Sequence, residues 1–478
     1  MSFLSFPFLA LFLPVMLLIY WSLCHSTKMQ NSVLFGGSLV FFYFAGGNTP
    51  VLLSCIVLSY LFGRIGSEEK KRTGKSILLW IGLLLNFSPL LLCRALDFLL
   101  QIKGKAYSWF SVLGIAFYTL QSSTYLIDLI KGKIDAEKDF VTYGLFVSFF
   151  PTVLSGPILK YREMQAVFHE KRKLSFEQME QAAFRFLWGA FLKSVIADRL
   201  ALITEQIFRM PEAYGGELLF WNMILYGLQL YTDFAGYSQM AIAVGAMMGI
   251  PIPHNFQRPY FAKTIQEFWH RWHQSLTSYL TENVYYPLGG NRKGETKRDA
   301  NIICVFLASG IWHGAGWSFV CWGMIHAAYQ ILGRRSLTLR KKMKQKMKLQ
   351  ENSRLDHVFR CVILNLMVAA GWLFFRLPTP QAALRYILWM IMKRSPWELV
   401  DGTLLSVMSL ADWMVLTVAI AVLFLGDIEA EHGKGVADIT KQIPAFRVLL
   451  FACAVIFVLI FGIYGPAFPA SSFIYAGF

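Results

Sequence analysis

The residue best placed to do chemistry is a histidine in a stretch without charge. His313 stands in SGIWHGAGW, near the middle of residues 300–333, a run with no Asp, Glu, Lys or Arg. A buried imidazole is neutral, because burial disfavours its charged form, and it can then accept a proton. Gly310, Gly314 and Gly316 would let a helix or a substrate approach the backbone closely. The alternative interpretation is a core histidine without a catalytic part.

A second polar group stands in EFWHRWHQSL, residues 267–276. His270 and His273 are three residues apart, so they share one side of a helix if the segment is helical. Trp269 and Trp272 suit a membrane interface, and an interfacial amphipathic helix would explain the segment without catalysis. We expect no metal site, because there is no HExxH motif, no third ligand is apparent and the seven cysteines are scattered.

Other polar candidates are less specific. Asp233, in YTDFAGYSQM, lies between long apolar stretches; it could form an ion pair, line a polar cavity or act in catalysis, and an ion pair is the commonest of these. The segment YYPLGGNRKG, which contains Asn291, indicates a glycine-rich turn, and no phosphate-binding motif supports an anion site there. GPILKYRE, which contains Arg162, indicates a helix end entering a basic loop that could contact a phosphorylated donor.

The composition places these residues in a membrane. Charged residues make up 15% of the 478 residues and hydrophobic ones 56%, whereas a soluble domain carries about 25% charged residues. The net charge is +16, and eight Lys and Arg with no acid fall between Arg334 and Lys348. In a soluble protein such a run would suggest nucleic acid. Between apolar segments it indicates a cytoplasmic loop near anionic lipid, as do the basic segments 64–75 and 160–173.

The apolar runs predict the helices that position the candidate functional residues. The charge-free runs include 1–27, 29–63, 76–93, 106–127, 140–159, 234–257, 300–333 and 448–478. One crossing needs about 20 apolar residues. The run 29–63 is interrupted by GGNTP and predicts two short helices, and 300–333 predicts a span broken around 309–316. We expect an all-α polytopic membrane protein with roughly 10–12 membrane-embedded helices and a single domain over 1–478.

Five of these segments occur in an order that resembles a known family. GPILKYRE, DFAGYSQMAIAVGAMMGIPIPHNFQRPY, EFWHRWHQSL, YYPLGGNRKG and IWHGAGW together resemble the membrane-bound O-acyltransferases. Their bacterial branch contains an alginate O-acetyltransferase membrane subunit and the D-alanyl transfer protein of teichoic acids. The motif-bearing part covers about 150–330, and the ending SSFIYAGF extends a weaker likeness. The resemblance implies a ring of helices around a thinner core, with a tunnel reaching the histidine from both membrane faces.

The resemblance also implies roles for particular residues. His313 corresponds to the histidine taken as catalytic in the family, and His273 to the second active-site position. His270 stands where the family commonly has Arg, so it is given no catalytic role. We further expect Asp233, Arg271, Asn291 and Arg162 to bind substrate. His313 would take the proton of a hydroxyl as its oxygen attacks the acyl carbon, while His273 orients the donor or stabilises the oxyanion.

These roles together predict an enzyme of the bacterial cell membrane. It would move an acyl group from a cytosolic thioester such as acetyl-CoA to hydroxyls of an extracytoplasmic polysaccharide or cell-wall polymer. Acetyl is the acyl group that the resemblance favours. The group could instead pass to a partner protein of the SGNH type. An acyl carrier protein is the donor in the alternative, D-alanyl transfer to teichoic acid, and a transporter or flippase is an alternative of another class. We expect contact with membrane lipid, no permanently bound cofactor and no nucleic acid.

Overall fold

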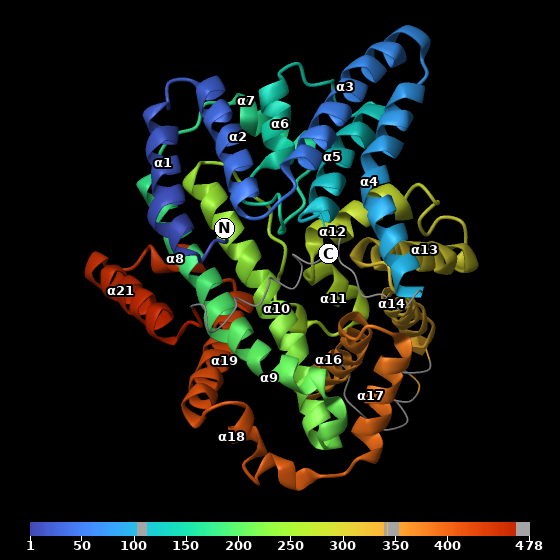
Figure 1. Cartoon of the computed structure of the whole chain (residues 1–478), viewed down its shortest axis with the longest axis vertical. Helices are drawn as coiled ribbons and strands as arrows, with labels where there is room; N and C mark the ends of the chain where they lie inside the picture. The colour runs from blue at the N-terminus through green and yellow to red at the C-terminus, as the bar shows by residue number, and fades with distance from the viewer. Residues whose placement is uncertain (103–111, 339–341, 343–352, 465–478) are drawn as a thin grey trace.

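The computed structural model describes residues 1–102, 112–338, 342 and 353–464, and these are helical with no strand. The ending SSFIYAGF and most of the basic run 334–348 lie outside these residues. Continuous apolar runs predicted such a fold, because each run can satisfy its own backbone only as a helix. The all-α prediction is therefore confirmed for the part of the chain described (Figure 1).

The first part of the chain forms the upper part of the view in Figure 1. Its helices are η1 (Pro7–Phe12), α1 (Leu13–Ser22), α2 (Thr27–Phe44), α3 (Thr49–Thr73), α4 (Ile77–Ile102), α5 (Ile115–Ile130), α6 (Phe140–Ser148) and α7 (Tyr161–His169). The predicted turn at GGNTP is confirmed between α2 and α3, where the Asn48 side chain accepts a hydrogen bond from Val51 N. GPILKYRE is not a helix end: α6 has already ended at Ser148, and the motif leads into α7.

A long helix, α10 (Gly216–Met247), crosses the middle of the molecule in Figure 1. Its neighbours include α8 (Phe176–Ala190), the π-helix η2 (Phe191–Ala197) and α9 (Asp198–Arg209), which η3 (Pro211–Ala213) follows. Because α10 packs against several elements, most of its side chains are buried, Asp233 among them. It therefore forms part of the core rather than a surface exposed to lipid.

Short helices and a helical hairpin carry the candidate histidines. They are η4 (Pro259–Phe261), α11 (Ile265–Arg271), α12 (Gln274–Leu280), η5 (Thr281–Tyr285), α13 (Glu295–His313) and α14 (Trp317–Arg335). The predicted break in 300–333 is confirmed, because α13 ends at His313 and α14 begins at Trp317. The hairpin is tight: a Cβ on Gly310 would lie 2.5 Å from the carbonyl oxygen of Phe319, and one on Gly323 2.4 Å from that of Phe306. Only glycine permits this approach.

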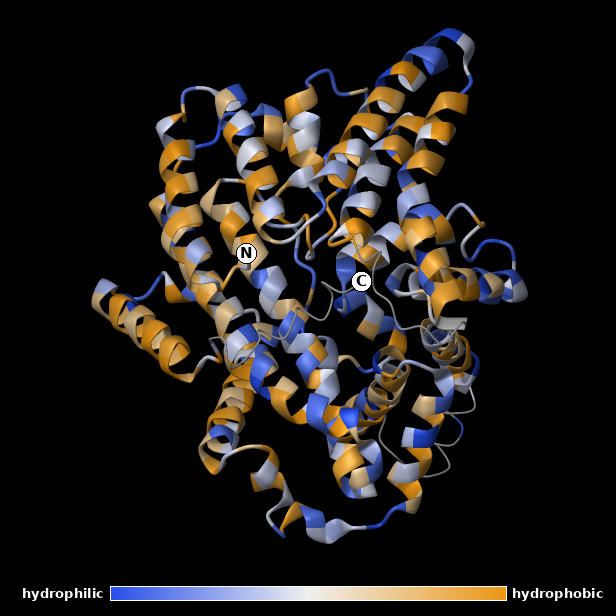
Figure 2. Cartoon of the chain, viewed as in Figure 1, coloured by the Kyte–Doolittle hydropathy of each residue, from blue (hydrophilic) through white to orange (hydrophobic). Residues whose placement is uncertain are grey.

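The last described part supplies the remaining helices. They are α16 (Arg354–Arg376), α17 (Pro380–Met392), η6 (Pro396–Leu399), α18 (Thr403–Val407), α19 (Leu410–Glu431), α20 (Val436–Ile439) and α21 (Pro444–Phe461). Among the described residues α3, α4, α16, α19 and α21 are long and apolar enough to cross a membrane. Only 6% of the most apolar stretch of α21 is buried within the protein, and most of this helix has the orange colour of hydrophobic residues in Figure 2. Such a helix needs lipid around it. The count of 10–12 embedded helices stays a prediction.

Candidate active site

His273 lies at a break between two helices, not on one helix with His270. Helix α11 ends at Arg271 and α12 begins at Gln274, and the backbone of His273 is left-handed, with φ 43° and ψ 55°. A non-glycine residue pays for this conformation with strain, which structures retain at functional sites. The interpretation of 267–276 as one helix with both histidines on one side is therefore wrong. His270 is exposed, while His273 is buried.

A buried asparagine holds the ring of His273. Nδ1 of His273 lies 3.1 Å from Oδ1 of Asn255, and this oxygen also accepts hydrogen bonds from the backbone N (3.2 Å) and Oγ (2.9 Å) of Ser275. Because Oδ1 is an acceptor, Nδ1 of His273 carries the proton. The neutral ring then has its lone pair on Nε2. Asn255 thus determines the tautomer, as partners of functional histidines commonly do.

His313 ends α13 and is enclosed by aromatic rings. Its side chain is 2% exposed. The ring centroid lies 4.6 Å from that of Trp312, 5.1 Å from that of Trp322 and 5.1 Å from that of Phe375. The next residue, Gly314, is extended, so the chain leaves the helix directly after the histidine. This enclosure favours the neutral imidazole that a proton acceptor needs.

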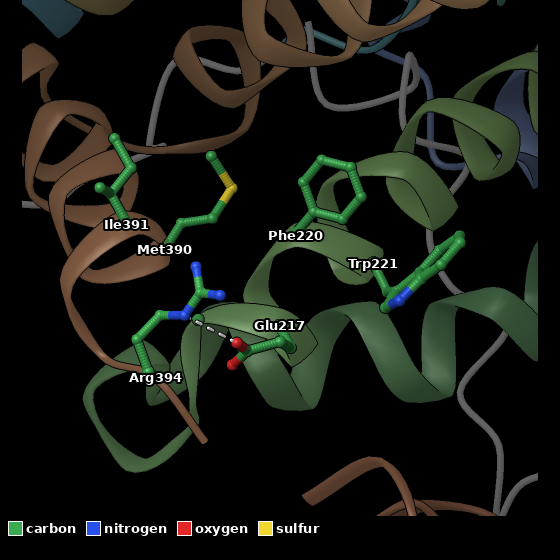
Figure 3. Close-up of a pocket in the computed structure, with 7 residues that line it drawn as sticks. Glu217, Phe220, Trp221, Met390, Ile391 and Arg394 are labelled. Atoms are coloured by element: carbon green, nitrogen blue, oxygen red, sulfur yellow. Dashed lines mark ion pairs between the residues drawn. The ribbon is translucent and has the colours of Figure 1, made fainter. Parts of the chain in front are cut away.

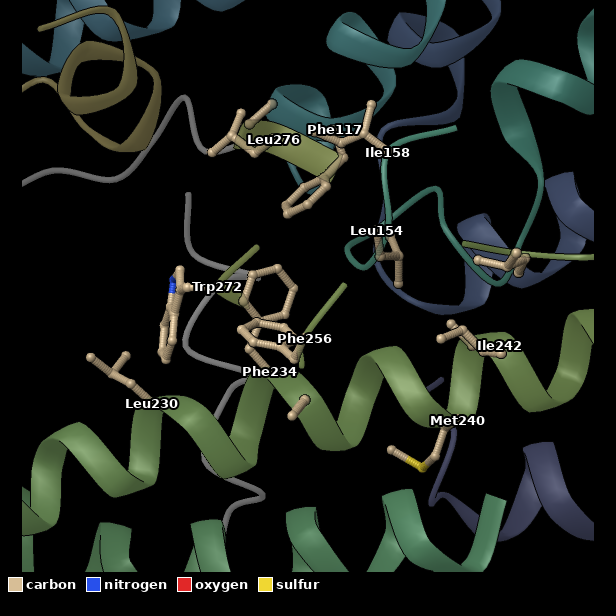
Figure 4. Close-up of a cluster of buried hydrophobic side chains, with 14 of the residues drawn as sticks. Phe117, Leu154, Ile158, Leu230, Phe234, Met240, Ile242, Phe256, Trp272 and Leu276 are labelled. Carbon is tan, nitrogen blue, oxygen red and sulfur yellow. The ribbon is translucent and has the colours of Figure 1, made fainter. Parts of the chain in front are cut away.

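The structure brings His273 and His313 together around Trp312. The indole of Trp312 lies 6.0 Å from the His273 ring and 4.6 Å from the His313 ring, centroid to centroid. Phe234 and Phe117 complete the wall beside His273, at 4.7 Å and 6.4 Å. Figure 4 shows these two phenylalanines within a layer of apolar side chains from several elements. The two histidines therefore lie among apolar rings, where electrostatic effects are stronger than in water.

Three of the four predicted substrate-binding residues form ion pairs with other side chains. Asp233 is buried and lies 2.6 Å from Nζ of Lys193, whose side chain is 12% exposed. Arg162 pairs with Glu282 at 2.7 Å and with Asp128 at 3.3 Å. Their role in binding stays a prediction.

The remaining two residues lie nearer the surface. Arg271 pairs with Glu431 at 3.0 Å and with Glu267 at 2.8 Å. Asn291 is exposed in the predicted turn of 285–294, which is confirmed by the positive φ of Gly289 and Gly290. Both remain candidates for substrate binding.

Two polar residues of this region escaped the sequence interpretation. Asn255, in IPIPHNFQRPY, carries no pattern of its own and is recognised only through its contact with His273. His326 lies in the same charge-free run as His313, so the same criterion would have found it. Its side chain is fully buried, and a Cβ on Gly371 would lie 2.8 Å from its Nε2.

A pocket lies elsewhere, between the start of α10 and the end of α17. Its lining includes Phe220, Trp221 and Met390, and Glu217 pairs with Arg394 at 3.1 Å (Figure 3). None of the predicted site residues lines it. The tunnel to His313 stays a prediction.

Comparisons with known proteins identify the family of the chain. Residues 133–374 match the model of the membrane-bound O-acyltransferase family, and this range encloses the predicted motif-bearing part. The chain is 31% identical over 390 residues to the probable alginate O-acetylase AlgI of Azotobacter vinelandii, covering 79% of this chain and 75% of the relative. It is 32% identical over 386 residues to the peptidoglycan O-acetyltransferase of Helicobacter pylori, covering 73% and 72%.

A more distant relative is the teichoic acid D-alanyltransferase of Bacillus subtilis. It is 28% identical over 254 residues, which cover 50% of this chain and 63% of the relative. The chain belongs to the membrane-bound O-acyltransferase family. It is accordingly a membrane-integral enzyme that transfers acyl groups.

Proposed function

We propose that the enzyme transfers acetyl groups from a cytosolic thioester, acetyl-CoA, towards an extracytoplasmic polysaccharide. Two relatives named as O-acetylating enzymes match about three quarters of the chain, whereas the D-alanyltransferase matches half of it. This difference supports O-acetylation over D-alanyl transfer. Membership of the family removes the reason to consider a transporter.

The juxtaposition of His273 and His313 around Trp312 carries the proposal. A sugar hydroxyl is a weak nucleophile until a base takes its proton. In the proposed reaction His313 accepts this proton while the hydroxyl oxygen bonds to the thioester carbonyl carbon. The carbon–sulfur bond then breaks, and the proton passes from His313 to the departing thiolate, giving an ester and free thiol.

His273 would orient the acceptor. With Nδ1–H directed at Asn255, the neutral ring has a lone pair at Nε2, which accepts a hydrogen bond and donates none. This tautomer suits a hydroxyl that must be held in place, and it suits an oxyanion only if the ring gains a second proton. We therefore favour a role in orienting the acceptor hydroxyl over the two roles that the resemblance implied, orienting the donor and stabilising the oxyanion. The four predicted binding residues, and a partner of the SGNH type that would complete the transfer, belong to the proposal as well.

The test uses purified protein in detergent with radiolabelled acetyl-CoA, and with fragments of alginate and of peptidoglycan as acceptors. We expect His313→Ala to lose at least about 100-fold in kcat, the contribution of a general base. We expect His273→Ala to lose about 10-fold or more, whereas His270→Ala, the exposed histidine of the same motif, keeps the wild-type rate. Undiminished transfer by folded His313→Ala protein would overturn the assignment. Transfer only from a D-alanyl carrier protein would replace acetyl with D-alanyl.

A further inference from the structure

A cation within α4, a helix long and apolar enough to cross a membrane, contacts the helix that ends at His313. Nη2 of Arg94 donates a hydrogen bond to the carbonyl oxygen of Trp312 at 3.0 Å. Trp312 is the last residue but one of α13, and carbonyl groups of a final helical turn have no partner within the helix. Arg94 therefore satisfies a carbonyl that lies one peptide unit from His313.

Trp312 is also held from the neighbouring helix. Its indole Nε1 donates to the carbonyl oxygen of Ala116, in α5, at 2.9 Å. The next residue, Phe117, meets the Trp312 ring edge-on at 5.4 Å and stacks on His273 at 6.4 Å. The backbone of Trp312 is thus tied to α4 and its side chain to α5. Together these helices fix the ring that both histidines contact.

The placement of Arg94 is costly unless it serves the site. Ionisable side chains in membrane spans are rare, and they face the protein interior when they occur. Nε of Arg94 is buried and has no hydrogen-bond partner. Asp97, one turn further along α4, has Oδ1 buried and likewise without such a partner. A helix that only crossed the membrane would gain from an apolar residue at 94, so packing does not explain this arginine.

We propose that Arg94 is a positioning residue of the acyl-transfer site, which fixes the backbone of Trp312 and thereby the orientation of His313. The inference rests on the proposed function of His313. A displacement of about 1 Å from the productive geometry costs on the order of 100-fold in rate. The loss falls on kcat, because the arginine acts on the proton acceptor and not on the acetyl-CoA donor.

The test compares Arg94→Met and Arg94→Lys with a matched arginine far from the histidines in sequence. Arg199, in α9, is buried, and its Nη2 donates at 2.9 Å to the carbonyl oxygen of Phe461, the last residue of α21. Arg199→Met therefore removes the same kind of hydrogen bond from another helix end, together with an ion pair to Asp412 at 3.2 Å. Initial rates are measured over a range of acetyl-CoA concentrations, and kcat is expressed per molecule that elutes as folded protein in detergent.

We expect Arg94→Met to lower kcat about 10-fold or more while the KM for acetyl-CoA stays within about threefold. Arg94→Lys, whose ammonium also donates, should regain most of the loss, and Arg199→Met should keep its kcat. If Arg94→Met keeps kcat within about threefold of wild type, or if Arg199→Met loses as much, the inference is wrong. Should Arg94→Met fail to fold, Arg94→Gln and Arg94→Lys decide by the same comparison. Full activity in His313→Ala would overturn the proposed function instead.

Discussion

Nδ1 of His273 lies 3.1 Å from Oδ1 of Asn255, and this single amide oxygen also accepts two hydrogen bonds from Ser275. The asparagine therefore joins the strained backbone at 273 to the start of α12. It fixes both the direction of the imidazole and the nitrogen that carries the proton. The orienting role proposed for His273 depends on this contact.

Replacement of Asn255 should accordingly impair catalysis. We expect Asn255→Ala to lower kcat about 10–100-fold, as loss of a residue that orients a functional histidine commonly does. Ser275→Ala is the control, because Asn255 keeps its bonds to His273 and to the backbone. Its kcat should stay within about threefold of wild type. A wild-type kcat in folded Asn255→Ala protein would contradict the role given to the amide.

Substitutions of Asp233 and of its partner Lys193 distinguish a structural ion pair from a substrate-binding residue. Nζ of Lys193 lies 2.6 Å from Asp233 and 2.8 Å from Asp198, within the core. Removing one partner of a buried pair is destabilising, so we expect Asp233→Asn to lose about 2–4 kcal/mol of stability. If the aspartate acts only in this ion pair, the acetyl-CoA KM of the folded fraction stays at the wild-type value. Lys193→Met should be at least as unstable, measured by thermal unfolding in detergent.

The opposite pattern would favour the interpretation from sequence. If Asp233 binds substrate, Asp233→Asn raises KM about 10-fold or more and Lys193→Met leaves it unchanged. Because the two variants alter the same ion pair, any difference between their KM values reports contact with substrate rather than stability.

Protonation of Glu282 should lower the stability of the protein at acid pH. Burial raises the pKa of this carboxyl, but hydrogen bonds and ion pairs with Lys160 and Arg162 outweigh burial and bring the pKa to about 2. A lowered pKa gives stability that is complete above the unfolded value of about 4.3 and is lost as the pH falls towards 2. We expect about 1–2 kcal/mol at neutral pH, because the pair is partly exposed.

The measurement is thermal unfolding at pH 6 and pH 3. The wild type should lose more apparent melting temperature between these values than Glu282→Gln, which has no carboxyl to protonate. Glu163→Gln is the control, because Glu163 lies 3.7–3.8 Å from the same two cations and its side chain is 52% exposed. It should behave like the wild type. Equal losses in wild type and Glu282→Gln would show that the pair adds no stability.

Gly371 should resist even the smallest substitution. A Cβ at this position of α16 would lie 2.8 Å from Nε2 of His326, a fully buried ring that packs 5.1 Å from Trp322. We expect Gly371→Ala to destabilise the protein by about 1–3 kcal/mol through overpacking. Gly36→Ala, at an exposed position of α2 with no atom near the added methyl group, should stabilise it slightly. Equal effects of both substitutions on thermal unfolding would contradict the close contact.

Local patterns predicted the elements better than the contacts between them. The break after His313 follows from small residues in an apolar run, and the turn between α2 and α3 from GGNTP, because both depend only on neighbours in the chain. The left-handed backbone of His273 depends on Asn255, 18 residues earlier, and no pattern indicates it. Arg271 pairs with Glu431, 160 residues away. A single sequence carries no signal for such a distant pair.

In the candidate site, too, the residues could be predicted from sequence but the contacts between them could not. His313 and His273 were predicted as a pair from a family resemblance, and the structure places both beside Trp312. Arg94 stands directly after the charge-free run 76–93, so an extended search of span ends would have found it. Its partner is the carbonyl oxygen of Trp312. Every residue has a backbone carbonyl, so the residue type at 312 gives no sign of this hydrogen bond.

The left-handed backbone at position 273 has a consequence for descendants of this protein. Histidine adopts that conformation at a cost of about 1–3 kcal/mol, whereas glycine and asparagine adopt it more readily. Glycine at this position would relieve the strain but would give up the packing of a buried ring against Phe234 and Trp312. A lineage could make that exchange only once it no longer needed the imidazole. Among relatives that keep the fold, Asn or Gly at this position would mark those in which the reaction has been abandoned.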